Sequence, residues 1–300
     1  MTGLPAYVER GAHPTGPGPF HCAQGTLRGF VLKADQVCLA DFSRSTYTEP
    51  CGGRIAYTPW SRYVLLLLGG FGRVCCTAAP YSGWGSVCEV QASFWLPLIA
   101  RSQDPSQPDR LVLAVPYILV DNPMSYLGGR EVYGYAKTMG RFSPASGLGQ
   151  AVTVEAYGGN YGPGSQAAWQ PLLEVSSATG GPVGGPAWGG MVELVAGLAP
   201  GLLDDPELLV DLLAGQPSQV FLKQFRDAQD GTRACYQAVV EAPVEINQAS
   251  ARPLGGDWTV RVHALDSHPI LSELGLVTPQ VAALAFEIET DFVVAAGACV

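Results

Sequence analysis

Runs of residues typical of β-strands dominate this chain, and they constrain its fold more than any other feature. They lie at 27–37, 62–70, 85–98, 111–120, 151–157, 219–226, 232–246, 259–265 and 283–294. A clear helix is predicted only over 202–215, where Asp205 is the N-cap, Pro206 lies in the first turn and Gly215 ends the helix. Strands that seldom alternate with helices disfavour a doubly wound parallel sheet. We therefore expect an α+β fold that is mostly β.

Three of these runs carry more specific expectations. The run 85–98 alternates, so Val87, Glu89, Gln91 and Ser93 share one face of the predicted strand. The run 62–70 (RYVLLLLGG) is predicted to end at its glycines. In the run 111–120, Pro116 indicates a sheet edge or a β-bulge, because proline cannot donate a ladder hydrogen bond.

Charge and composition exclude several classes of protein. The formal net charge of −9, without any basic run, argues against a nucleic-acid partner. The first residues, MTGLPAYVERGAHP, do not have the pattern of a signal peptide, and the apolar run 64–70 is too short to span a bilayer. We expect a cytoplasmic protein with no membrane partner.

The cysteines and histidines do not have metal-ligand spacing. There are eight cysteines but no CxxC pair, and no cysteine lies within 25 residues of His263 or His268. A zinc site is therefore not expected, and we interpret the cysteines as small buried apolar residues in a reducing compartment.

The segment 128–140 (GGREVYGYAKTMG) contains Lys137, one of only three lysines in the chain. A lysine can attack a carbonyl group only as the neutral amine, which burial or a nearby cation favours. If this segment were extended, Glu131, Tyr133, Tyr135 and Lys137 would share one face. The alternative is an ordinary solvated lysine in a loop, and the scarcity of lysine can reflect a GC-rich genome alone.

This segment resembles the G-R-E-x-x-x-Y-P-K-K-L-G signature of acetoacetate decarboxylase and its relatives. Three further stretches resemble that family: PYILVDNP, QVFLKQFRDAQDGTRACYQAV and HALDSHPILSELGL. The resemblance covers about residues 25–295. It implies one domain over 1–300, a cone-like closed or partly closed β-barrel with peripheral helices, and a homo-oligomer. It implies no cofactor and no metal. We expect an irregular N-terminal arm over 1–25 and a Gly/Pro-rich insertion over 158–200.

The resemblance also assigns roles to residues. Lys137 takes the position of the lysine that forms a Schiff base with a keto substrate, and Glu89 that of a catalytic carboxylate. Arg28 corresponds to an arginine that approaches the substrate carboxylate. Glu131, Tyr133 and Tyr135 are expected to contribute to substrate binding.

Three departures from the family pattern leave the reaction open. Thr138 replaces a second lysine and Ala136 replaces a proline. The stretch FGRVCCTAA lacks a second glutamate that the family has some fifteen residues before Glu89. The expected function is a Schiff-base lyase that decarboxylates a β-keto acid such as acetoacetate. The alternatives are an aldolase, dehydratase or cyclase that uses a pyruvate-type imine, and a non-catalytic member of the fold that binds a small ligand.

Overall fold

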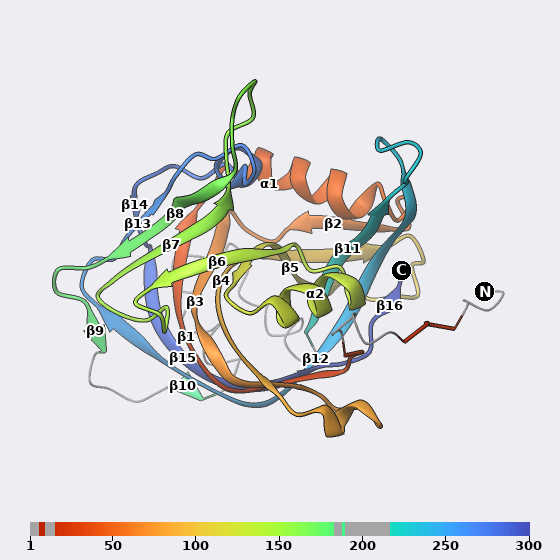
Figure 1. The fold of residues 1–300 in the computed structure, drawn as a ribbon, viewed down its shortest axis with the longest axis horizontal. Helices are drawn as coiled ribbons and strands as arrows, with labels where there is room; N and C mark the ends of the chain where they lie inside the picture. The colour runs from red at the N-terminus through yellow and green to blue at the C-terminus, as the bar shows by residue number, and fades with distance from the viewer. Residues whose placement is uncertain (1–5, 10–15, 183–187, 190–216) are drawn as a thin grey trace.

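The computed structural model describes residues 6–9, 16–182, 188–189 and 217–300 (Figure 1). The helix predicted over 202–215 lies outside these ranges. The helical elements are α1 (Gln36–Ser43), a π-helical turn (Arg44–Thr48), a 3-10 turn (Tyr81–Trp84), α2 (Pro123–Val132) and α5 (Ile270–Leu274). The longer strands are β1 (Phe20–Lys33), β2 (Ile55–Pro59), β3 (Tyr63–Cys76), β4 (Val87–Ser102), β5 (Arg110–Val120), β6 (Lys137–Ser143), β7 (Ala151–Gly158), β8 (Ala168–Ser176), β11 (Ser218–Arg226), β12 (Ala234–Gly255), β13 (Thr259–Val262) and β15 (Leu284–Val294). The short ones are β9 (Gly181–Pro182), β10 (Trp188–Gly189), β14 (Gln280–Val281) and β16 (Ala298–Cys299).

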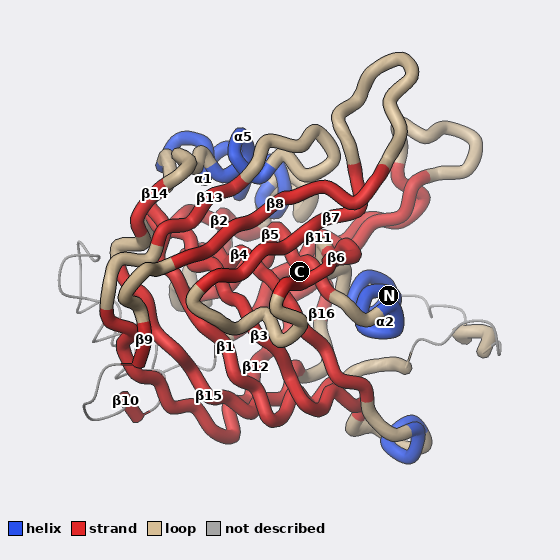
Figure 2. Tube along the Cα trace, turned by 60° about the vertical axis from the view of Figure 1, so that its left-hand side comes forward, coloured by secondary structure: helices blue, strands red, loops and turns tan. Residues whose placement is uncertain are grey.

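The longer strands form a closed hydrogen-bonded ring with a branch. The ring runs β5–β11–β12–β15–β1–β3–β4 and returns to β5, with only the β5–β11 pair parallel. The branch leaves β5 through the parallel strand β6 and continues β7–β8–β13–β14. Figure 2 shows these two groups of strands facing each other. The predicted mostly β fold is confirmed, whereas the cone-like barrel shape stays a prediction.

Side-chain alternation along each strand separates two apolar regions. On β1, Phe30 and Leu32 belong to the large core that also contains Val154 and Leu173 of the branch. Leu27 and Val31 point to the other face, where they cluster with residues of β3, β12 and β15. Because successive side chains of a strand point to opposite faces, one face of each ring strand packs against the branch while the other faces the interior of the ring. The candidate functional site lies on this interior face.

Strand β3 corrects one expectation, because it continues through its glycines to Cys76. Gly69 has φ = 138°, and a Cβ there would lie 2.2 Å from the carbonyl oxygen of Thr26 on β1. Glycine is needed at this position because neighbouring backbones approach closely, so it does not end the strand.

The segment 27–37 also differs from its expectation. Strand β1 begins at Phe20, inside the stretch expected to be irregular, and ends at Lys33. Asp35 then caps α1 by accepting hydrogen bonds from the backbone N–H groups of Val37 (2.8 Å) and Cys38 (3.1 Å). The glycine-rich region after residue 158 contains a nine-residue strand, β8, that the sequence did not predict.

The β-bulge predicted at Pro116 is confirmed. The pairing of β4 with β5 shifts register between Phe94 (opposite Tyr117) and Leu96 (opposite Ala114), which leaves Pro116 inside the irregularity. The other neighbour of β5 also changes here, from β11 at residues 112–114 to β6 at residues 118–120. Proline is tolerated because no continuous partner strand requires its missing N–H.

Candidate active site

The segment that carries Lys137 is a helix followed by a tight turn and a strand. Asn122 caps α2 by accepting hydrogen bonds from the N–H groups of Met124 (2.9 Å) and Ser125 (3.2 Å), and Pro123 occupies the first turn. Gly134, with φ = 94°, turns the chain after the helix, and β6 begins at Lys137. The condition considered for Glu131 to Lys137, an extended segment with its side chains on one face, is therefore not met, since Glu131 lies in the helix.

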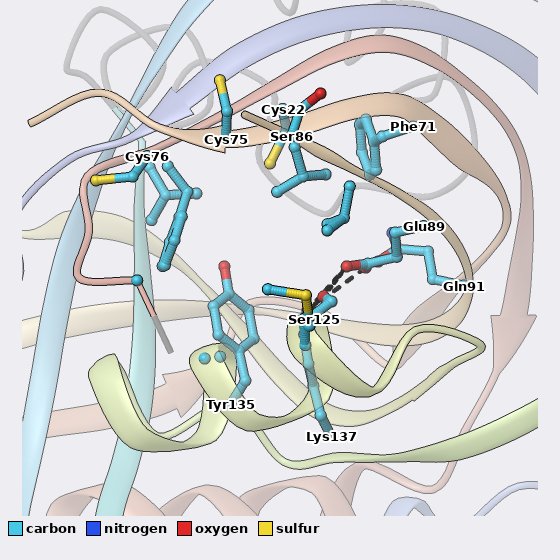
Figure 3. Close-up of a pocket in the computed structure, with 18 of the residues that line it drawn as sticks. Cys22, Phe71, Cys75, Cys76, Ser86, Glu89, Gln91, Ser125, Tyr135 and Lys137 are labelled. Atoms are coloured by element: carbon cyan, nitrogen blue, oxygen red, sulfur yellow. Dashed lines mark hydrogen bonds and ion pairs between the residues drawn. The ribbon is translucent and has the colours of Figure 1, made fainter. Parts of the chain in front are cut away.

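Lys137 is buried, with 7% of its surface exposed, and its amine lies within hydrogen-bonding distance of two side chains (Figure 3). The distances from Nζ are 3.2 Å to Glu89 Oε2, 3.5 Å to Glu89 Oε1 and 2.5 Å to Ser125 Oγ. Nζ also lies 5.4 Å from the centroid of the Tyr135 ring. These contacts fix the amine at the end of an otherwise apolar side chain.

Glu89 reaches the amine from the interior face of β4. Only 5% of its surface is exposed, and it accepts a hydrogen bond from the Ser125 hydroxyl group. Lys137, Glu89 and Ser125 thus form a closed cluster in which protons can pass between an amine, a hydroxyl group and a carboxylate. The sequence analysis missed Ser125, although the Asn122-Pro123 pair signals a helix start that would have placed this residue in the first turn.

Gly129 leaves the space that the lysine side chain occupies. A Cβ at Gly129 would lie 2.9 Å from both Cδ and Cε of Lys137, closer than a carbon–carbon contact allows. The equivalent atom at Gly128 would have its nearest neighbour, a ring carbon of Phe20, at 3.9 Å. The second glycine of the pair is therefore the one that lets Lys137 lie along α2.

A cavity of about 250 Å³ adjoins the cluster. Its wall includes Lys137, Glu89 and Ser125. Residues of the ring, of the turn at 81–84 and of neighbouring segments also line it, among them Phe20, Cys22, Phe71, Val74, Cys75, Cys76, Trp84, Gln91, Trp95, Ile118, Tyr135, Gln219, Phe292 and Val294. Among the described residues that line it, Glu89 is the single carboxylate and Lys137 the single cationic group. The other polar side chains of the wall are Gln91, Gln219, Ser86, Tyr81 and Tyr135, and the rest of the wall is largely apolar.

Two other titratable groups of the wall stay protonated at neutral pH. Burial, and to a lesser extent the Glu89 carboxylate, raises the pKa of the Cys22 thiol to about 12. Burial also raises the pKa of Tyr135 well above its ordinary value, and its hydroxyl group donates a hydrogen bond to Gln219 Oε1. Neither group can act as a general base near pH 7.

Thr138 points away from the cavity. It follows Lys137 on β6, and its hydroxyl group lies 3.1 Å from Nε2 of His268. A lysine at position 138 would extend from the same face, away from the Lys137 amine. The replacement of the family's second lysine by Thr138 therefore does not remove a cation from beside Lys137.

The residues expected to bind substrate are only partly brought together. Tyr135 lines the cavity. Tyr133 is buried behind it and donates hydrogen bonds to the carbonyl oxygens of Val294 (3.1 Å) and Ala295 (3.0 Å). Arg28 lies on the opposite face of β1, where it bonds to Glu287 (3.1 Å) and Gly149 O (2.7 Å). Arg28, Glu131 and Tyr133 are not part of the cavity wall.

The stretch FGRVCCTAA lies in the wall at the position where the family resemblance implied a second glutamate. Phe71, Val74, Cys75 and Cys76 line the cavity from β3. This part of the wall contains apolar and thiol groups and no carboxylate among the described residues. The described residues contain no group of three or more histidine, cysteine or acidic side chains placed to hold a metal ion. They contain no helix with the length and apolar character needed to cross a membrane.

Comparison with solved structures identifies the fold. Acetoacetate decarboxylase from Legionella pneumophila matches with a TM-score of 0.57 and 11% identity over 100% of this chain and 92% of that chain. An acetoacetate decarboxylase-like enzyme from Sphingomonas wittichii RW1 matches with a TM-score of 0.55 and 11% identity, covering 96% and 94%. The enduracididine biosynthesis enzyme MppR, complexed with pyruvate, matches with a TM-score of 0.54 and 12% identity, covering 95% and 91%.

Sequence comparisons do not extend this result. No protein-family model matches the chain, and no curated protein sequence matches it. The structural likeness runs over nearly the whole chain, and its fold is that of the family which the segment around Lys137 resembles. The chain has the fold of acetoacetate decarboxylase and of the enzymes that resemble it.

Proposed function

We propose that this protein is a lyase that decarboxylates a β-keto acid through a Schiff base on Lys137. One observation carries the proposal: the Lys137 amine is buried against a single carboxylate and borders a cavity large enough for a small substrate. A lysine that serves only as a surface charge would not be placed in the wall of an apolar cavity.

The proposed reaction begins when the neutral amine attacks the keto carbon and water leaves, which gives a protonated imine. The bond between the carboxyl carbon and its neighbour then breaks, its electron pair moves into the iminium group, and CO₂ departs. The resulting enamine takes up one proton on carbon, and water hydrolyses the imine to release a ketone and Lys137. No external oxidant or reductant is needed.

Glu89 and Ser125 are placed to move the protons of this sequence. The Lys137 amine attacks only as the neutral form, and Glu89 is the carboxylate placed to accept its proton. The Ser125 hydroxyl group touches both partners and offers a path for that transfer. The protonated Glu89 could then supply the proton that the enamine takes up.

The charges around the cavity favour decarboxylation over chemistry on a pyruvate imine. A substrate carboxylate would enter an apolar space that already holds Glu89, and the wall offers no guanidinium to neutralise it. Loss of CO₂ removes this desolvated negative charge. A pyruvate imine retains its carboxylate throughout, so it requires a cationic partner that the described part of the wall does not supply.

Borohydride trapping tests the proposal. Reduction in the presence of acetoacetate should attach a fixed mass to Lys137, and that mass should show that the carboxyl group has been lost. The chain contains only Lys33, Lys137 and Lys223, so peptide mass spectrometry assigns the site without ambiguity. Lys137→Arg should abolish both trapping and CO₂ release, because a guanidinium does not form the imine.

Lys223 provides the matched control. It is half-buried, burial lowers its pKa, and its amine donates to the carbonyl oxygen of Val132 at 3.0 Å. Lys223→Arg should leave trapping at Lys137 intact. Trapping of pyruvate with no release of CO₂ from any β-keto acid would favour the aldolase or dehydratase alternative. Stabilisation by keto acids that persists in Lys137→Arg, without any adduct in the wild type, would favour a non-catalytic binding protein.

A further inference from the structure

A second cavity, of about 220 Å³, lies inside the ring next to the first. Every strand of the ring contributes to its wall, from Leu27 of β1 and Trp95 of β4 to Ile288 of β15. The two cavities share five wall residues: Phe71, Gln91, Trp95, Gln219 and Phe292. We call the second cavity the inner chamber.

The strands run from one cavity into the other in a consistent order. Along β4, Glu89 lines the first cavity, Gln91 lines both and Pro97 lines only the inner chamber. Along β15, the same order is Val294, Phe292 and Ile288. The inner chamber therefore continues the first cavity along the axis of the ring. Its wall on β4 extends from Gln91 to Pro97, a distance of roughly 20 Å along the strand.

The wall of the inner chamber is apolar. It contains no charged side chain among the described residues, and its aliphatic groups come from opposite sides of the ring. Leu65 and Leu113 are only half-buried although they lie in ring strands, so part of their apolar surface faces the chamber. Covering such surface with an apolar ligand group is favourable in proportion to the area removed from water.

A buried polar side chain marks the boundary between the two cavities. Gln91 is 5% exposed, and its amide makes no hydrogen bond with any residue that the structure describes. No amide atom of Gln91 is both fully buried and without a partner, so the amide is open to the cavity, where a ligand can hydrogen-bond to it in place of water. The polar head of a ligand would therefore end at Gln91, and its apolar part would continue into the inner chamber.

We propose that the substrate is a 3-oxo acid with an extended apolar tail. The tail lies in the inner chamber, the keto carbon of the acid reacts with Lys137, and Gln91 forms a hydrogen bond with the polar head. The proposal rests on the proposed function and narrows its substrate class to acids longer than acetoacetate. Binding energy from a remote tail can be used to raise kcat/KM.

A series of straight-chain 3-oxo acids of four to eight carbons tests this inference. Decarboxylation should show kcat/KM rising about fourfold for each added methylene, the gain expected for burying one CH₂ group. A profile that is flat or that falls with chain length, with Lys137 still trapped by acetoacetate, would overturn the tail inference and leave the proposed function standing.

A variant that reduces the chamber provides the second measurement. Leu113→Trp should lower the ratio of kcat/KM for the eight-carbon acid to that for acetoacetate by at least tenfold. Leu113→Met, which nearly conserves the volume, should keep that ratio within about twofold of the wild type. An unchanged ratio in a folded Leu113→Trp protein would contradict the inference.

Acids without a keto group separate this inference from the Schiff-base chemistry. The corresponding 3-hydroxy acids cannot form an imine, but their tails can still enter the chamber. Thermal stabilisation that rises with their chain length, without any trapping of 3-oxo acids, would support the chamber and refute the proposed function. Absence of both stabilisation and trapping would refute both.

Discussion

Glu89 and Glu287 are two carboxylates that the fold buries almost equally, with 5% and 8% of their surfaces exposed. Each accepts a charged hydrogen bond at close range, 3.2 Å from Lys137 for Glu89 and 3.1 Å from Arg28 for Glu287. Each has a second donor, the Ser125 hydroxyl group for Glu89 and the Arg252 guanidinium for Glu287. By burial and pairing alone the two carboxylates are alike.

The difference between them lies in the partner and in the space beside it. Guanidinium groups do not lose a proton in proteins, so the Arg28–Glu287–Arg252 cluster has one protonation state at neutral pH. The amine of Lys137 can lose a proton, and the first cavity lies next to it. Glu287 lines neither the first cavity nor the inner chamber. A buried ion pair therefore indicates chemistry only when one partner can transfer a proton and a substrate can reach it.

The largest effects should come from neutralising each carboxylate in turn. Glu89→Gln should lower kcat by about 10²- to 10⁴-fold, because it removes the positioned proton carrier. Its free energy of unfolding should fall as well, by up to about 3 kcal/mol, because removing one partner of a buried ion pair leaves the other partner without its countercharge. Steady-state CO₂ release and urea unfolding measure the two quantities.

Glu287→Gln should lower stability without lowering activity. The largely buried Arg28 would lose its carboxylate, which destabilises the protein by about 3 kcal/mol, while kcat of the folded fraction should stay within about twofold. The comparison fails if Glu287→Gln loses as much activity as Glu89→Gln at a temperature where both are folded.

A smaller effect is expected from the glycine pair of α2. Gly129→Ala should displace the Lys137 side chain and lower kcat by roughly tenfold, because small misplacements of a nucleophile are costly. Gly128→Ala introduces the same methyl group on the same helix but has open space there, so its kcat should remain close to that of the wild type. Gly128→Ala should be at least as stable as the wild type, since alanine favours helix over glycine, whereas the clash with the buried Lys137 side chain offsets that gain in Gly129→Ala. Equal activity in the two variants would show that the position of the amine is not limiting.

The smallest effect concerns the pH dependence of the Glu287 cluster. Burial raises the pKa of Glu287, but hydrogen bonds and charge from Arg252 and Arg28 outweigh it, so the pKa lies below its ordinary value of 4.5. The folded protein then binds fewer protons than the unfolded chain just below pH 4.5, and the stabilisation from this group decreases as the pH falls. The stability difference between wild type and Glu287→Gln should be constant above pH 4.5 and should shrink below it. Urea unfolding at pH 7, 5 and 3.5 checks this, and a difference that grows on acidification would contradict the sign.

The strand pattern could be predicted from the sequence, and Lys137 could be proposed as a nucleophile, but the residues around that lysine were predicted less well. Alternation along 85–98 placed Glu89 and Gln91 on one face, as the structure has them. Glycine and proline were less informative, because Gly69 lies inside a strand and Asn122-Pro123 begins a helix that was not recognised. In both cases tertiary structure decided against the local pattern. At Gly69 the cause is the close approach of neighbouring backbones, and for α2 it is the packing of a helix of only ten residues beside the ring.

The sequence by itself determined that this chain forms mostly strands, which of their side chains share a face, and that Lys137 is its candidate nucleophile, because these properties depend on residues within a few positions of one another. Only the tertiary structure decided that Lys137 meets Glu89, 48 residues away, and Ser125, and that Arg28 and Thr138 point elsewhere. It alone also revealed the inner chamber. The physical reason is that closure of the ring sets which strand faces which, and local patterns carry no information about that closure.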